Sequence, residues 1–162
     1  MKTLWFNLCL VALTPAIGPA QGPKSRTPFK PVDGAFFALS VADVAASALW
    51  YSEKLGLDVV LEIPNQGGTA VTVLEGGGLT VELLQLNGAR PLRNACPGVT
   101  DPQSVHGFFK AGFVVKDLDD VVTELRARGV EIAFGPFPAT ESQRANVIIK
   151  DNSGNLIQLF GR

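Results

Sequence analysis

The chain has 162 residues, of which 46% are hydrophobic and 18% charged, enough for one sizeable core and one domain. Lys and Arg total 14 against 15 Asp and Glu, so the net charge of −1 indicates neither nucleic acid nor an anionic membrane as a partner. Two cysteines and one histidine, His106, exclude a disulfide framework, a zinc-ligand array and any mechanism that needs two histidines.

Residues 1–20 have the pattern of a secretory signal peptide. Lys2 precedes the apolar stretch Leu4–Ile17, and the small residues Gly18 and Ala20 suit a cut before Gln21. The alternative, a membrane anchor, is disfavoured because the stretch is shorter than the roughly 20 residues of a spanning helix. We therefore expect an exported protein, periplasmic or extracellular, with no membrane partner after cleavage.

Residues 21–33 contain three prolines and no periodic apolar pattern, which predicts an exposed tether before a folded domain at 34–162. Two segments of that domain, 34–87 and 108–162, repeat one strand, one helix and three strands. The first has expected strands at 35–41, 57–63, 69–74 and 79–86 and a helix at 44–55; the second has strands at 108–115, 130–134, 146–150 and 155–160 and a helix at 118–128.

Matching residues recur between the two segments at nearly constant offsets. Val41 and Asp43 of the first segment correspond to Val115 and Asp117 of the second, 74 positions later. Asp43 is suited to cap the first helix. Gly56 is suited to end that helix, and one ring of Trp50-Tyr51 is expected to pack against the sheet. The prediction is an α+β fold in which two βαβββ modules close their sheets on a cleft.

Several segments resemble the vicinal oxygen chelate superfamily, which includes glyoxalase I, extradiol dioxygenases, fosfomycin-resistance transferases and bleomycin-binding proteins. The resemblance spans 34–162 and implies a curved, glyoxalase-like sheet with a central cleft. It rests on the segments ALSVAD at 38–43, WYSEKLGL at 50–57, VEL at 81–83, DLD at 117–119, LRARGV at 125–130 and DNSGNLIQL at 151–159.

Enzymes of this superfamily hold a divalent metal on four cleft positions, which the resemblance places at Phe36, Glu82, Lys110 and Gln158. Phe36 and Lys110 offer no lone pair, so Glu82 and Gln158 are only weak candidates and we expect no metal and no other cofactor. Glu82 and Lys110 would instead face each other as an ion pair. The alternative is that both are solvated strand residues.

Alternation along the strands extends this lining to a mostly apolar pocket suited to a small organic molecule. The expected ligand-binding residues are Phe36, Ala38, Ser40, Thr80, Glu82, Lys110, Gly112, Gln158 and Phe160. By the same alternation Leu84, Val114 and Leu156 share this face, but for these three we expect core packing.

The stretch 87–107 between the modules is either a cover for the cleft or a plain linker. His106 is expected to be a loop residue, and Cys96 has no neighbouring base that would make it a nucleophile. No Ser-His-Asp grouping, phosphate loop or dinucleotide fingerprint is present.

Together these patterns predict an exported, metal-free binding protein for a small organic molecule, with a homodimer as the expected assembly. One alternative is an enzyme, either a metal-dependent lyase, isomerase or dioxygenase, or a metal-free one with Glu82 as general base. Another is a scaffold with a filled cleft that serves only as an interaction module.

Overall fold

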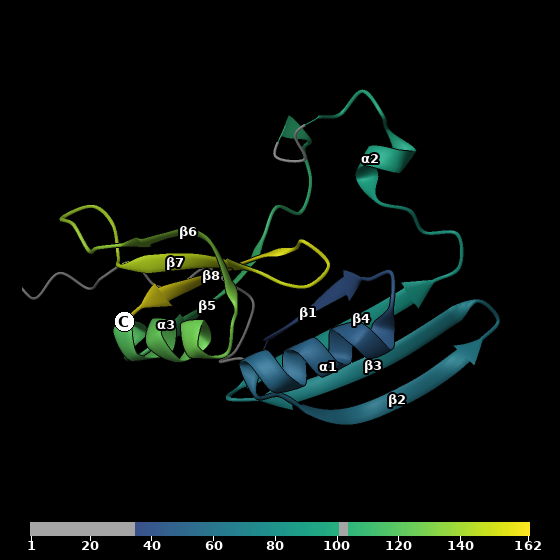
Figure 1. The fold of residues 1–162 in the computed structure, drawn as a ribbon, viewed down its shortest axis with the longest axis horizontal. Coiled ribbons are helices and arrows are strands. Elements are labelled where there is room, and N and C mark those ends of the chain that lie inside the picture. Colours follow the sequence, from purple (N-terminus) through teal and green to yellow (C-terminus); the bar gives the residue numbers. More distant parts are fainter. Residues whose placement is uncertain (1–34, 101–103) are drawn as a thin grey trace, which may run out of the picture. The chain divides into compact units, whose positions relative to one another are not determined.

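The computed structural model describes residues 35–100 and 104–162, so the expected signal peptide 1–20 and tether 21–33 lie outside the described residues. Two βαβββ modules follow one another, as expected (Figure 1). The first consists of β1 (Ala35–Ser40), α1 (Val44–Leu55), β2 (Asp58–Gln66), β3 (Thr69–Gly76) and β4 (Leu79–Leu86). The second consists of β5 (Ala111–Val115), α3 (Leu118–Ala127), β6 (Glu131–Phe137), β7 (Asn146–Lys150) and β8 (Leu156–Gly161).

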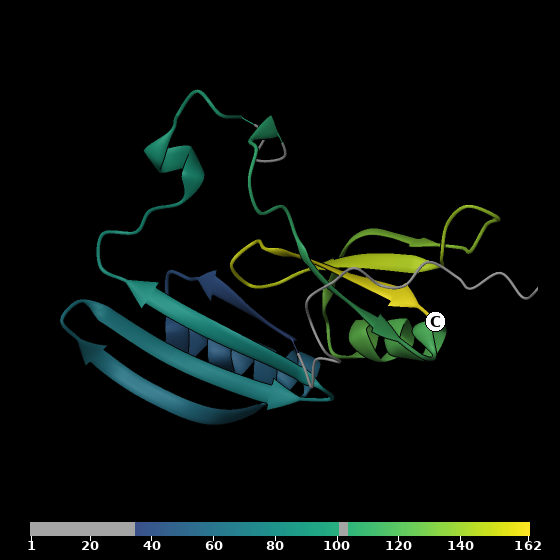
Figure 2. The same cartoon turned by 180° about the vertical axis from the view of Figure 1, so that it is seen from behind.

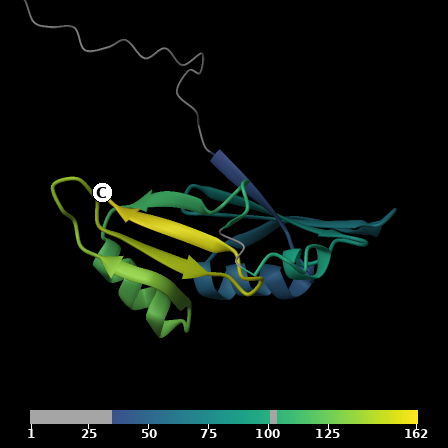
Figure 3. The ribbon, with the colours of Figure 1, turned by 90° about the horizontal axis from the view of Figure 1, so that it is seen from above.

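Each module forms its own four-stranded mixed sheet, in the order β1-β4-β3-β2 and β5-β8-β7-β6. β1 runs parallel to β4 and β5 parallel to β8, while the remaining neighbours are antiparallel. α1 lies on one face of the first sheet and leaves the other face without a helix, as the view from behind shows (Figure 2). α3 covers one face of the second sheet in the same way (Figure 3). The α+β prediction is confirmed.

Some element bounds differ from the sequence prediction. β5 begins at Ala111 rather than at Phe108, because pairing with β8 starts at Ala111 and Ile157 and the preceding residues have no neighbouring strand. The stretch between the modules contains a short helix, α2 (Leu92–Ala95), that the pattern did not predict. No helix in the described part of the chain is long and apolar enough to cross a membrane.

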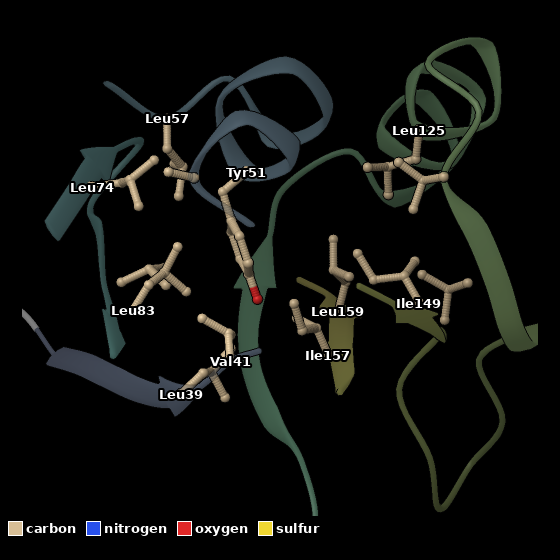
Figure 4. Close-up of a cluster of buried hydrophobic side chains, with 14 of the residues drawn as sticks. Leu39, Val41, Tyr51, Leu57, Leu74, Leu83, Leu125, Ile149, Ile157 and Leu159 are labelled. Carbon is tan, nitrogen blue, oxygen red and sulfur yellow. The ribbon is translucent and has the colours of Figure 1, made fainter. Parts of the chain in front are cut away.

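One core contains the helix-covered faces of both sheets (Figure 4). Leu83 of the first sheet and Ile157 of the second belong to this single buried cluster. The ring of Tyr51 lies between the buried side chains of the first sheet and those of the second. Tyr51 is fully buried, and its hydroxyl donates a hydrogen bond of 3.0 Å to Oδ2 of Asp151 in the β7–β8 turn. The ring of α1 expected to pack inward is therefore Tyr51, and it also connects the two modules.

The equivalent aspartates before the two helices differ in what they contact. Oδ1 of Asp43 accepts a hydrogen bond of 3.0 Å from the backbone N–H of Ala46, whereas the side chain of Asp117 makes no capping bond. We expect Asp43→Ala to lower the free energy of unfolding by about 1 kcal/mol, the usual cost of losing a side-chain cap. The matched Asp117→Ala should cost less than half as much in urea unfolding. Equal losses would mean that the Asp43 bond does not stabilise the helix.

Candidate functional site

The uncovered face of the first sheet carries the predicted residues of β1 and β4. Phe36 is 67% exposed and pairs in register with Thr80, and Ala38 pairs with Glu82. Ser40 lies on the same face, while the alternate residues of both strands, such as Leu39 and Leu83, are buried beneath α1. The predicted alternation therefore assigns these side chains to the open face.

The uncovered face of the second sheet carries Gly112, paired with Gln158, and Phe160, paired with Val114. Gln158 is buried, and its Nε2 donates a hydrogen bond of 2.9 Å to Oδ1 of Asn146. A Cβ on Gly112 would lie 3.0 Å from the backbone oxygen of Gln158, so this glycine permits the close approach of β5 and β8. Gly112 thus has a structural role whether or not a ligand contacts it.

The expected core packing of Val114 is wrong. Its side chain is 53% exposed, because within the described residues α3 covers the opposite face of this sheet and no layer covers its own. Leu84 and Leu156, which share the open faces, are half-buried rather than fully buried. The open faces therefore leave apolar side chains partly exposed, beside polar ones such as Thr80 and Glu82.

The expected ion pair between Glu82 and Lys110 does not form within the chain. The two salt bridges among the described residues join Glu124 to Arg128 and Glu131 to Lys150. Both modules contribute their helix-covered faces to the common core, so the open faces that carry Glu82 and Lys110 do not close on each other there. Nζ of Lys110 instead lies 5.5 Å from the ring centroid of Phe109.

The four metal positions of the superfamily do not provide a metal-binding donor set in this chain. Phe36 has no donor atom, the ammonium of Lys110 has no lone pair, and Gln158, whose Nε2 donates to Asn146, offers one amide oxygen. No three His, Cys, Asp or Glu side chains of residues 35–100 and 104–162 are grouped so that they could hold a metal ion. Glu82 is left as the single carboxylate, too few donors for a tight site.

A cavity of about 600 Å³ lies beside the second sheet, between the end of the inter-module stretch and the strands β6 to β8. Its volume is in the range of sites for drug-sized ligands. It contains one of the predicted site residues, Lys110. The other lining residues are Leu92, Val105, His106, Gly107, Phe108, Phe109, Glu131, Ile132, Ala133, Phe134, Lys150, Gly154, Asn155 and Leu156.

Sequence reasoning missed most of this cavity. It assigned Phe108 and Phe109 to a strand and His106 to a loop without a role, whereas all three line the cavity. One signal was present in the sequence, because Phe108-Phe109-Lys110 puts two aromatic residues directly before a cation. Four residues of the stretch 87–107, Leu92, Val105, His106 and Gly107, line this cavity, which is not the cleft that the sequence predicted.

A second cavity, of about 760 Å³, lies between the end of α1, the β3–β4 turn and α3. The charges of its lining residues cancel, because Lys54 and Arg128 are positive and Asp120 and Glu124 are negative. It contains none of the nine predicted ligand-binding residues, and Arg128 is already bonded to Glu124 at 2.7 Å. The first cavity is therefore the better candidate for a binding site.

The repeated module, the two mixed sheets and the open faces define a glyoxalase-like protein. The model of the Glyoxalase/Bleomycin resistance protein/Dioxygenase superfamily matches residues 35–159. The chain belongs to this superfamily, which confirms the resemblance inferred from its sequence segments.

Solved structures of similar fold include proteins with different roles. A glyoxalase family protein from Enterococcus faecalis is 20% identical, with a TM-score of 0.61 over 82% of this chain and 98% of that one. The antibiotic binding protein TnmS3 from Streptomyces sp. CB03234 is 20% identical, with a TM-score of 0.55 over 83% and 98% of the two chains. The fosfomycin resistance protein FosX from Listeria monocytogenes, complexed with Mn(II), is 13% identical, with a TM-score of 0.53 over 82% and 90%.

At these identities the likeness shows the fold and not the reaction. No curated protein matches the chain. The structural neighbours include both a metal-bound protein and an antibiotic binding protein, so the superfamily by itself does not select between catalysis and binding.

Proposed function

We propose that this chain is an exported member of the superfamily that binds a small organic molecule without a catalytic metal. The observation that carries the proposal is the cavity of about 600 Å³, whose lining is largely apolar with a few charged side chains. Export rests on the leader pattern of residues 1–20 and their small residues before Gln21.

The donor chemistry of the open faces supports binding without a metal. Of the four superfamily positions only Glu82 and Gln158 carry oxygen donors, and they lie on different sheets. A single carboxylate and one amide oxygen do not hold a hard divalent cation tightly. An enzyme that uses Glu82 as general base remains the competing function, and it requires a substrate on the open face of the first sheet.

Exposed apolar side chains on the open faces support a homodimer as the assembly we propose. Exposed apolar residues on these faces include Phe36 and Val114, and β1 and β5 are edge strands in the order of their sheets. Exposed apolar side chains and unpaired strand edges are typical of surfaces that a partner covers. We propose that a second copy covers them.

Native mass spectrometry of the protein from its own compartment tests this proposal in one measurement. We expect the mass of a chain cut before Gln21, a dimer, and an organic ligand that is lost when the protein is denatured. A monomer would contradict the assembly, and an uncut chain would contradict export. A protein that carries no organic ligand and does not retain small molecules in solution would contradict the binding function.

Titration with nickel, zinc and manganese after chelator treatment tests the proposal that the protein binds its ligand without a metal. We expect neither stoichiometric binding nor a rise in melting temperature, because an ion that binds only the folded state would stabilise it. Glu82→Ala is the matched variant and should behave as the parent does in each titration. Stoichiometric binding at micromolar metal that is lost in Glu82→Ala would establish a metal site and favour the enzyme alternative.

A further inference from the structure

We propose that the cavity beside the second sheet selects flat aromatic anions, with Lys110 as the residue that recognises the negative charge. This inference rests on the proposed binding function and narrows it to one class of ligand. It is carried by three features of the lining: an unpaired cation, exposed aromatic rings around it and the distribution of the remaining charges.

The charges that line the cavity come from four residues. Lys150 is neutralised by Glu131, whose Oε1 lies 2.6 Å from Nζ. His106 is the third titratable side chain, and Lys110 is the fourth. Neither of the two salt bridges among the described residues includes Lys110, so the cavity has one net positive charge in addition to any charge on His106.

Lys110 is half-buried as a residue, and its ammonium forms no salt bridge with a carboxylate of the described residues. Its neighbour is the ring of Phe109, 5.5 Å away at the centroid, a contact that holds the ammonium over an aromatic face. A ligand that fills the cavity would exclude water from the ammonium, and its anionic group would supply the missing counter-charge in a charge-assisted hydrogen bond.

The rings around Lys110 determine the rest of the ligand. Phe108 is 75% exposed, Phe109 48% and Phe134 44%, and all three line the cavity. Covering exposed aromatic side chains around a cavity removes apolar surface from water, which favours binding of a ligand. Their preferred partners are other flat rings. A planar aromatic body with one acidic group therefore satisfies both the rings and the lysine.

Two probes that share a ring system separate the contribution of charge from that of shape. The anionic probe is 8-anilinonaphthalene-1-sulfonate, and the neutral one is N-phenyl-1-naphthylamine, which lacks the sulfonate. Fluorescence titration of the purified protein should show one anionic probe bound per chain, about tenfold more tightly than the neutral probe, as expected for one charge-assisted hydrogen bond.

Variants then assign that preference to the cavity. Lys110→Gln should bring the affinities of the two probes together by weakening only the anionic one, and Lys110→Arg should preserve the preference. Lys116→Gln removes the same charge from an exposed position that lines none of the cavities described, and it should leave both affinities unchanged. Phe108→Ala should weaken both probes, and circular dichroism verifies that each variant is folded.

The outcomes also separate the ligand class from the binding function. Equal affinities for the two probes in the parent, or a preference that survives Lys110→Gln, would overturn the anion assignment and leave small-molecule binding intact. Failure of both probes to bind, in a protein that retains an organic ligand in native mass spectrometry, would overturn the aromatic anion class alone. Failure of both probes without any retained ligand would overturn the proposed function as well.

Discussion

Alkaline titration of the folded protein should produce no tyrosinate signal until the protein unfolds. Tyr51 is the single tyrosine of the chain, so the absorbance of tyrosinate reports this residue alone. Burial of the side chain, and secondarily the charge of Asp151 and the hydrogen bond to it, raise the pKa of Tyr51 far above its ordinary value.

The sign of the effect on stability follows from proton linkage. In the unfolded chain Tyr51 loses its proton near pH 10, at about the ordinary pKa of tyrosine, whereas in the folded chain it keeps the proton. The stabilisation linked to this proton is complete below about pH 10 and falls by about 1.4 kcal/mol per pH unit above it. Tyr51→Phe removes this dependence, so the difference between the two unfolding curves against pH isolates it.

Tyrosinate absorbance and near-ultraviolet circular dichroism, followed on the same samples, check this prediction. We expect the two signals to change together as the protein unfolds. A tyrosinate midpoint near pH 10 with an intact dichroism spectrum would show that the hydroxyl of Tyr51 is accessible to water and that the contact with Asp151 is not maintained.

Asp151→Ala should be among the most destabilising substitutions outside the apolar core. The carboxylate is 5% exposed and accepts hydrogen bonds from the Tyr51 hydroxyl, the Ser153 N–H, and the backbone N–H and side-chain amide of Asn155, at 2.7–3.0 Å. Alanine would leave the buried hydroxyl of Tyr51 without an acceptor and would release the β7–β8 turn. We expect a loss of about 3–4 kcal/mol in the free energy of unfolding.

A double-mutant cycle separates the contribution of the Tyr51–Asp151 hydrogen bond between the modules, here called the Tyr51–Asp151 junction, from that of the bonds of Asp151 within the β7–β8 turn. Tyr51→Phe removes the hydroxyl and leaves no orphaned donor, so it should cost about 1 kcal/mol, and Asp151→Ala should be less costly in that background than in the parent. Urea unfolding of the four proteins measures the coupling. Additive losses would mean that Asp151 acts within its own turn and does not connect the modules.

Much of the fold could be predicted because its determinants are local. Alternation of side chains along β1 and β4 was sufficient to assign Phe36 and Glu82 to one face and Leu83 to the other, since the period of a strand is two. The position of Asp43 before the apolar helix predicted that it caps the helix, and its Oδ1 accepts a hydrogen bond from the N–H of Ala46. The start of β5 was predicted too early because pairing with β8, not apolar character, decides where it begins.

The candidate site was less predictable because its contacts join distant segments. Position in the repeat placed Lys110 opposite Glu82, but the common core joins the helix-covered faces of the modules and separates this pair within one chain. His106 and Phe108 line a cavity only because the end of an irregular linker lies beside β6 to β8. No periodic pattern in a linker specifies which strand it will contact.

The sequence by itself determined the two modules and the residues on each sheet face, and the resemblance to the superfamily added that the implied metal positions carry few donor atoms. These properties depend on residue type and spacing along one segment, which physical chemistry relates directly to strands, helices and ligand chemistry. Only the tertiary structure decided the Tyr51–Asp151 junction, joined across 100 residues, and the cavity around Lys110. Both depend on which buried surfaces pack together, and that choice minimises the free energy of the whole domain rather than of any one segment.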